Sequence, residues 1–169
     1  MLDASFLKNL RTIEARYPDR RSAILPALYL LRERDGYITP EGMQALAVHF
    51  DISPMAVHEV GSFYTMLNFR PVGRHHIQVC RTLPCKLRGS DQVTDCIANK
   101  LGISVGEVTP DGAFSLMTVE CLGSCDTAPM MQVNDLYYEN LSRARIDAVL
   151  DELKDEDASY TKRPGPDGF

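Results

Sequence analysis

Four cysteines in the second half of the chain carry the chemistry that the sequence indicates most directly. Cys80 and Cys85 form a first pair, with four residues between the thiols. Cys121 and Cys125 form a second pair, with three residues between them, and 35 residues separate the two pairs. Each pair is short enough to lie on one loop, and a fold that joins the loops would gather four thiolates. The spacing therefore predicts a four-thiolate metal site with all four cysteines as ligands.

Three uses of these thiols stay open on spacing alone. A [2Fe–2S] cluster takes two thiolates per iron, and its negative charge needs backbone N–H groups directed at the sulfurs, which Gly123 would help to provide. Structural zinc usually takes pairs with two to four intervening residues, so the Cys80–Cys85 pair stands at the wide limit. Dithiol redox catalysis is the third use, but the chain has no Cys-x-x-Cys. The spacing favours the iron–sulfur cluster over zinc.

The other side chains of types that can bind a metal are not expected to be ligands. A Rieske-type centre needs histidine beside a ligating cysteine, and no Cys-x-His occurs. Cys96 is expected to be a small buried residue, and Met130 and Met131 are expected to lie in a core. The histidines are expected at the surface where a strand begins (His75, His76) or as ordinary helix residues (His49, His58).

The composition limits the classes of partner. The chain has 169 residues and a net charge of −5, without the basic face that nucleic acid requires. Its longest apolar run, residues 23–31, is far shorter than the roughly 20 residues of a membrane span. We find no targeting sequence, so we expect the chain to stay in the cytoplasm, with its five cysteines reduced.

Residues 1–70 are predicted to form a helical subdomain. Apolar residues recur there at spacings of three and four, and two serine or threonine residues followed by proline are typical of helix starts. Together these features predict four helices: 1–17, 22–34, one that opens at Thr39-Pro40, and one from Ser53-Pro54 to about Met66. Four short amphipathic helices in succession imply a compact bundle.

Residues 74–153 show a mixed pattern. Alternation, helical spacing and turn residues predict, in order, a strand over 76–80, a helix over 87–101, a strand over 114–119, a hairpin over 130–138 turning at Asn134-Asp135, and a helix capped by Ser142. This is the order of a thioredoxin-like fold. It places Cys80 at the end of the first strand and Cys121 just past the second, so both pairs lie at one edge of the sheet.

The predicted fold class is therefore α+β, a helical bundle followed by a thioredoxin-like α/β domain. Residues 154–169 are polar and non-periodic, with two prolines and two glycines, and are predicted to be a tail.

Several of these motifs, taken together, resemble a known family. They are Cys80-x4-Cys85, Cys121-Leu-Gly-Ser-Cys125 followed by Pro129, Gly106-Glu-Val-Thr-Pro-Asp-Gly112, Gly36-Tyr37-Ile38 with Pro40, and Val60-Gly-Ser-Phe-Tyr64 followed by Pro71-Val-Gly73. In this order they resemble the thioredoxin-like [2Fe–2S] subunit, known as the E-type component, of the NADH dehydrogenase module of respiratory complex I. The resemblance covers roughly residues 5–153.

The resemblance implies one [2Fe–2S] cluster held by Cys80, Cys85, Cys121 and Cys125. It implies a larger flavoprotein partner that binds FMN, NADH and a [4Fe–4S] cluster, and an electron exchanged between that FMN and the cluster of this chain. The chain itself lacks the glycine-rich phosphate loop of a nucleotide site, so no separate substrate site is expected. The assembled complex would hold it at the bacterial inner membrane without direct insertion.

Two alternatives to that function remain. Relatives of this subunit serve NAD-linked hydrogenases and formate dehydrogenases, where the catalytic partner determines the substrate. A different class of protein, a zinc-stabilised interaction module without a redox role, would use the same four thiols.

Overall fold

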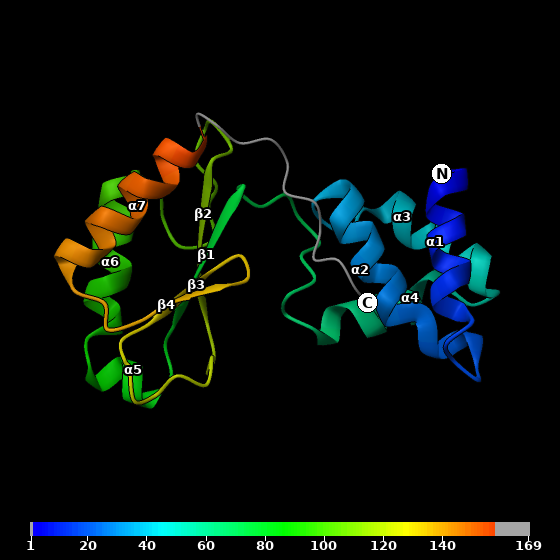
Figure 1. Cartoon of the computed structure of the whole chain (residues 1–169), viewed down its shortest axis with the longest axis horizontal. Coiled ribbons are helices and arrows are strands. Elements are labelled where there is room, and N and C mark those ends of the chain that lie inside the picture. The colour runs from blue at the N-terminus through cyan, green and yellow to red at the C-terminus, as the bar shows by residue number, and fades with distance from the viewer. Residues whose placement is uncertain (1, 158–169) are drawn as a thin grey trace. The chain divides into compact units, whose positions relative to one another are not determined.

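The structure is a computed structural model that describes residues 2–157 (Figure 1). The described residues divide into two compact units, which we call the first unit, residues 2–71, and the second unit, residues 72–157.

The first unit is helical. Its elements are α1 (Ala4–Glu14), a 3-10 turn η1 (Arg20–Ala23), α2 (Ile24–Asp35), α3 (Pro40–Phe50) and α4 (Pro54–Phe63). Asp3 caps α1, and the side chains of Thr39 and Ser53 cap α3 and α4 by accepting from Gly42 N at 3.0 Å and Ala56 N at 3.1 Å. The four predicted helices are confirmed, although α1 ends three residues before Tyr17 and α4 ends at Phe63, because Tyr64 is extended.

A single apolar core holds these helices together. It consists of Phe6, Leu10, Ala23, Ile24, Ala27, Leu28, Leu31, Ile38, Leu46, Ala47, Phe50, Val57 and Leu67. A polar contact also joins two of these helices: Nε2 of His49 on α3 lies 2.9 Å from Oε1 of Glu14 on α1. His49 is thus on a helix, as predicted, and links two helices as well.

The second unit contains a four-stranded sheet with the strand order β2-β1-β3-β4. Its strands are β1 (His75–Cys80), β2 (Phe114–Val119), β3 (Met131–Val133) and β4 (Leu136–Tyr138). β1 runs parallel to β2 and antiparallel to β3, and β3 and β4 form the predicted hairpin, with Asn134 in its turn at φ 53°. The predicted thioredoxin-like arrangement of strands is confirmed.

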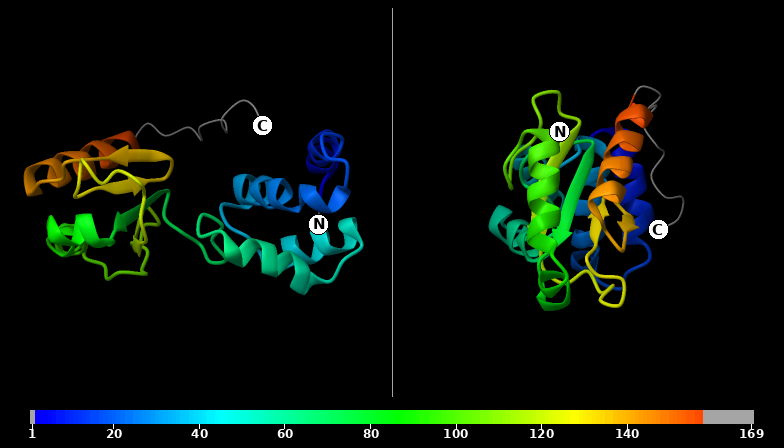
Figure 2. Two further views of the ribbon diagram at one scale, coloured as in Figure 1. Left: turned by 90° about the horizontal axis from the view of Figure 1, so that it is seen from below. Right: turned by 90° about the vertical axis from the view of Figure 1, so that its left-hand side faces the viewer.

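Helices α6 (Ser90–Leu101) and α7 (Arg143–Asp157) lie together on one face of this sheet (Figure 2). The core between these helices and the sheet contains Ile77, Val79, Val93, Ile97, Ile103, Ala113, Phe114, Leu116, Met131, Val133, Leu141, Ile146, Val149, Leu150 and Leu153. Met130 and Met131 are fully buried, as predicted, whereas Cys96 is only half-buried against this core. The Ser142 hydroxyl accepts from Arg145 N at 3.3 Å, which confirms the predicted cap.

Three expectations need correction. The helix predicted over 87–101 is interrupted, because Gly89 has φ +93° and separates a short α5 (Leu83–Leu87) from α6. His75 is buried, not at the surface, because β1 is a central strand and its first residue pairs with Phe114 on β2. Residues 154–157 belong to α7, and the rest of the predicted tail lies outside the described residues.

Within residues 2–157, every helix is too short or too polar to cross a membrane.

Candidate metal centre

The two cysteine loops leave the sheet at the same edge. β1 ends at Cys80 and the parallel β2 ends at Val119, and these two residues are partners in the ladder. Arg81 N donates to Val119 O at 3.0 Å just beyond the strands, so the loops begin side by side. The predicted positions of Cys80 and Cys121 relative to the strands are confirmed.

The first cysteine pair is buried. Cys80, at the end of β1, is 3% exposed and Cys85, on α5, is 2% exposed. Their thiols contact each other through a hydrogen bond. They form a small apolar cluster with Ala128 and Met130, against which the half-buried Leu122 packs. The first pair is therefore held in an apolar, largely dry environment.

The second pair lies on an exposed loop. Cys121 and Cys125 are both exposed, and their thiols also contact each other. Gly123, between them, has φ +86°, a conformation that favours glycine. Its N–H donates to Cys121 Sγ at 3.4 Å. The glycine thus fulfils the role that the sequence predicted for it, which is to turn a backbone N–H toward a sulfur.

Backbone N–H groups also face the buried sulfurs. Burial raises the pKa of the Cys80 thiol, but hydrogen bonds from the N–H groups of Leu122 and Thr82, and from the side chains of Cys85 and Thr82, together lower that pKa below its ordinary value. Burial, followed by the hydrogen bond with Cys80, raises the pKa of Cys85 to about 11, although Met130 N–H donates to this sulfur. The loop geometry therefore favours negative charge on Cys80 in particular.

The two pairs also act on each other electrostatically. The pKa of Cys125 is raised first by its hydrogen bond with Cys121, then by burial and by the charges of Cys121 and Cys80. In turn, the charge of Cys125 contributes to the raised pKa of Cys85. Thiolates of the two pairs would repel one another, and bound metal cations would relieve that repulsion.

A [2Fe–2S] cluster fits this donor set. Each iron takes two thiolates, and the thiols here are arranged as two contacting pairs. Sulfurs of three cysteines receive backbone N–H groups, which is the stabilisation that an anionic cluster needs. In the part of the chain that the structure describes, no three Cys, His, Asp or Glu side chains are grouped closely enough to hold a single metal ion. The ligand assignment to the four cysteines thus stays a prediction.

Sequence reasoning missed the residues that support these loops. Leu122 and Thr82 donate to Cys80, while Tyr137 and Glu139 hydrogen-bond to the loop of the second pair. The interval between Cys121 and Cys125 already pointed to close backbone approach, but nothing local in the sequence connects residues 137–139 to it. Cys96 is on α6 and takes no part in either pair.

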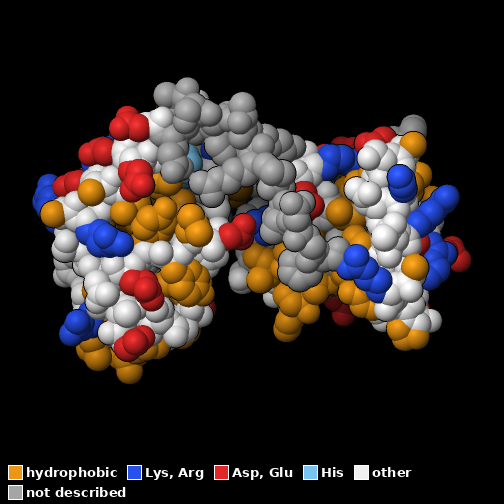
Figure 3. All heavy atoms as spheres, viewed as in Figure 1, with side chains coloured by type: hydrophobic (Ala, Val, Ile, Leu, Met, Phe, Trp, Pro, Cys, Tyr) orange, Lys and Arg blue, Asp and Glu red, His pale blue; other side chains and the backbone are white. Residues whose placement is uncertain are grey.

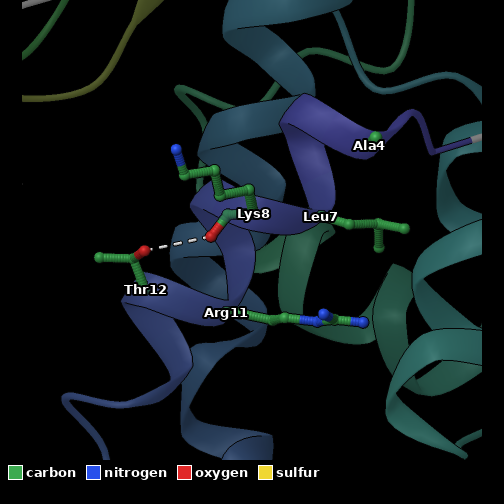
Figure 4. Close-up of a pocket in the computed structure, with 5 residues that line it drawn as sticks. All are labelled: Ala4, Leu7, Lys8, Arg11 and Thr12. Atoms are coloured by element: carbon green, nitrogen blue, oxygen red, sulfur yellow. Dashed lines mark hydrogen bonds between the residues drawn. The ribbon is translucent and has the colours of Figure 1, made fainter.

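Two surface depressions lie elsewhere, on the first unit. One, of about 460 Å³, is lined by α1, where Leu7 and Arg11 extend toward the same side (Figure 4). The other, of about 750 Å³, lies between α1 and α3, with Leu7 and Val48 in its lining. Neither lining contains a cysteine, so the candidate chemistry belongs to the sheet edge of the second unit.

Comparison with known proteins supports this assignment of chemistry. A family model described as thioredoxin-like [2Fe-2S] ferredoxin matches residues 10–154. The chain belongs to this family. The cysteine spacing and the other motifs predicted a resemblance to a thioredoxin-like [2Fe–2S] protein, and this match confirms it.

Proteins similar to this chain include subunits of NADH-quinone oxidoreductases. An E-type component of the NADH-quinone oxidoreductase of Rhizobium meliloti is 43% identical over 147 residues, covering 87% of this chain and 88% of the relative. NADH-quinone oxidoreductase subunit 2 of Thermus thermophilus is 48% identical over 143 residues, covering 83% and 79%.

A solved structure shares the fold of this ferredoxin. The air-oxidised NAD⁺-reducing [NiFe]-hydrogenase superposes with a TM-score of 0.70 and 22% identity, over 79% of this chain and 23% of the hydrogenase chain. At this level of identity the likeness concerns the fold alone.

Proposed function

We propose that this chain is the electron-transfer subunit of an NADH-quinone oxidoreductase and binds one [2Fe–2S] cluster through Cys80, Cys85, Cys121 and Cys125. The observation that carries the proposal is the pair of cysteine loops at one sheet edge, with backbone N–H groups directed at their sulfurs. The proposal is also supported by relatives that are 43% and 48% identical over most of the chain and are named as subunits of that enzyme.

A bound cluster would supply reversible transfer of one electron. The chain's own residues would hold the cluster, exclude water from one side of it and stabilise its charge. Cys80 and Cys85 anchor the site in the apolar cluster and exclude water from that side. Cys121 and Cys125 lie at the surface, where a redox partner can approach. The backbone donors offset the negative charge of the sulfurs and so bear on the reduction potential.

The redox partner in this proposal is a flavoprotein subunit that carries FMN, NADH and a [4Fe–4S] cluster. The absence of a glycine-rich phosphate loop in the sequence fits a chain that leaves nucleotide binding to its partner. Leu83 and Leu87 are exposed at the two ends of α5, on either side of Cys85 in the sequence, and would suit a protein contact. Figure 3 shows hydrophobic side chains on the surface of the second unit. The complex would operate at the cytoplasmic side of the bacterial inner membrane.

The NAD-linked hydrogenase alternative has weaker support, because the hydrogenase shares only 22% identity, against 43% and 48% for the NADH-quinone oxidoreductase subunits. Isolation of the intact assembly under mild conditions, with its partners identified by mass spectrometry, separates these two functions. A hydrogenase or formate dehydrogenase catalytic subunit among the partners would reject the complex I assignment.

The zinc alternative is tested on the isolated chain. Anaerobic purification should give a brown protein with about two irons and two acid-labile sulfides, as a [2Fe–2S] cluster requires. Its visible absorption should bleach on reduction with dithionite. A colourless protein with one zinc and no labile sulfide would reject the electron-transfer function.

A further inference from the structure

The exposed cysteine loop is held in place by the segment that ends the β3-β4 hairpin. Oη of Tyr137, on β4, donates to Leu122 O at 2.8 Å. Directly after β4, Oε1 of Glu139 accepts hydrogen bonds from Oγ1 of Thr127, at 2.7 Å, and from Oγ of Ser124. Two side chains from one hairpin therefore contact the Cys121–Cys125 loop at two points.

Backbone hydrogen bonds continue this attachment. Asn140 N donates to Thr127 O at 2.8 Å, and Leu141 N donates to Pro129 O at 2.9 Å. Residues 137–141 thus run alongside residues 122–129 and bond to them along their length. The exposed loop is supported from one side by a regular element of the sheet, although it has no secondary structure of its own.

The contact at Leu122 reaches the other cysteine pair. The N–H of Leu122 donates to the Cys80 sulfur, and its side chain packs on the buried cluster that includes Cys85. Because Tyr137 holds the carbonyl of the same residue, it fixes a peptide segment that bridges the two cysteine loops. A shift of Leu122 would change the distance between the pairs and remove a donor from Cys80.

The contact at Glu139 has an electrostatic side as well. The hydroxyls of Ser124 and then Thr127 hold the pKa of Glu139 below its usual range, so the side chain is an anion at neutral pH. Ser124 directly precedes Cys125, which brings a fixed negative charge to the loop of this exposed thiol. A nearby negative charge opposes the addition of an electron and so lowers a reduction potential.

We propose that Tyr137 and Glu139 are positioning residues for the metal centre, which hold the Cys121–Cys125 loop against the buried pair, and that Glu139 also lowers the reduction potential. This inference rests on the proposed function, because the centre that it concerns is the [2Fe–2S] cluster of that proposal.

Three variants of the purified, cluster-containing chain test the inference. Glu139→Gln keeps an oxygen acceptor and removes the charge, Glu139→Ala removes both hydrogen bonds, and Tyr137→Phe removes a single hydroxyl. Glu152→Gln is the matched control, because it neutralises an exposed carboxylate on α7. The readouts are the reduction potential, the EPR and visible circular dichroism spectra, and the rate of iron release to a chelator. Far-UV circular dichroism checks that each variant is folded.

We expect Glu139→Gln to raise the reduction potential more than Glu152→Gln does, and to keep its cluster. Glu139→Ala and Tyr137→Phe should release iron about tenfold faster than the wild type, the usual effect of removing a residue that supports a metal ligand. Both should also shift the EPR g-values, which a general loss of stability would not do.

Two outcomes would overturn the inference, and they are distinguishable. Wild-type iron release, spectra and potential in all three variants, in a protein that does bind the cluster, would reject the positioning role and leave the proposed function intact. Zinc in place of iron in the wild-type chain would reject both.

Discussion

The backbone N–H of Leu122, in the loop of the second cysteine pair, donates a hydrogen bond to the sulfur of Cys80 in the first pair. The Leu122 side chain packs on the apolar cluster that contains Cys80 and Cys85, and so lies between this pair and solvent. One residue of the exposed loop therefore both stabilises charge on a buried sulfur and shields it from water. A direct link of this kind couples the two halves of the centre, so disturbance of either loop should affect the whole site.

Leu122→Ala should weaken that shield while it leaves the N–H donor in place. With water admitted to Cys80 and Cys85, we expect iron to pass to a chelator about tenfold faster, as is usual when the immediate surroundings of a metal site are altered. Leu136→Ala is the matched control, because Leu136 is 52% exposed on β4 and covers no cysteine. Equal release rates for the two variants would show that Leu122 does not protect the centre.

Cys121→Ala should abolish stable cluster binding, because one iron would keep only a single thiolate from the protein. Cys96→Ala should retain the cluster, since Cys96 packs half-buried against the core of the second unit and belongs to neither pair. The measurement is iron and labile sulfide per chain, with the visible spectrum. Equal cluster loss in both variants would mean that the ligands are misassigned.

The sequence was sufficient to predict those structural features that depend on residues only a few positions apart. The proline-containing helix starts at Thr39 and Ser53, the turn at Asn134 and the strand ends beside the cysteine pairs all follow from residue types within a few positions. Membership of an iron–sulfur protein family was predictable for a similar reason, since two short pairs of thiols in a reduced chain have few uses.

Features that depend on distant partners could not be predicted. His75 has the pattern of a strand entrance, yet it is buried because β1 became the centre of the sheet. The support that Glu139 gives to Ser124 joins residues 15 positions apart, and the bond from Tyr137 to Leu122 spans the same interval. Gly89 stands inside a run of helical spacing, and only its positive φ reveals that α5 and α6 are separate.

Lys100 should give the protein an alkaline pH dependence of stability. Its Nζ, on α6, lies 2.8 Å from Asp151 and 3.3 Å from Asp147 on α7, and the hydrogen bond with Asp151, despite burial, raises the pKa of Lys100 above its ordinary value. A raised pKa in the folded state gives stability that is fully present below the unfolded-state pKa of about 10.4 and is lost as the pH rises through the folded-state value.

Lys100→Met should therefore unfold at lower urea concentration than the wild type at pH 8, and this difference should shrink at pH 11. Lys154→Met, at an exposed position on α7, is the control and should change the urea midpoint little at either pH. A Lys100→Met deficit that stays constant up to pH 11 would show that the ion pairs with α7 do not cause it.

Gly73 should be the least replaceable glycine of the second unit. Its N–H donates to Ser115 Oγ at 2.9 Å, and a Cβ at this position would lie 2.3 Å from the carbonyl carbon of Phe114, in the backbone of β2. Because β2 is paired with β1 along its length, that backbone has little room to move, and we expect Gly73→Ala to cost about 3 kcal/mol or more in the free energy of unfolding. At Gly106 the added Cβ would meet open space, so Gly106→Ala should cost only the 1–2 kcal/mol or so of a non-glycine residue at positive φ. Urea unfolding followed by circular dichroism compares the two, and a smaller loss at Gly73 would show that the strand yields to the methyl group.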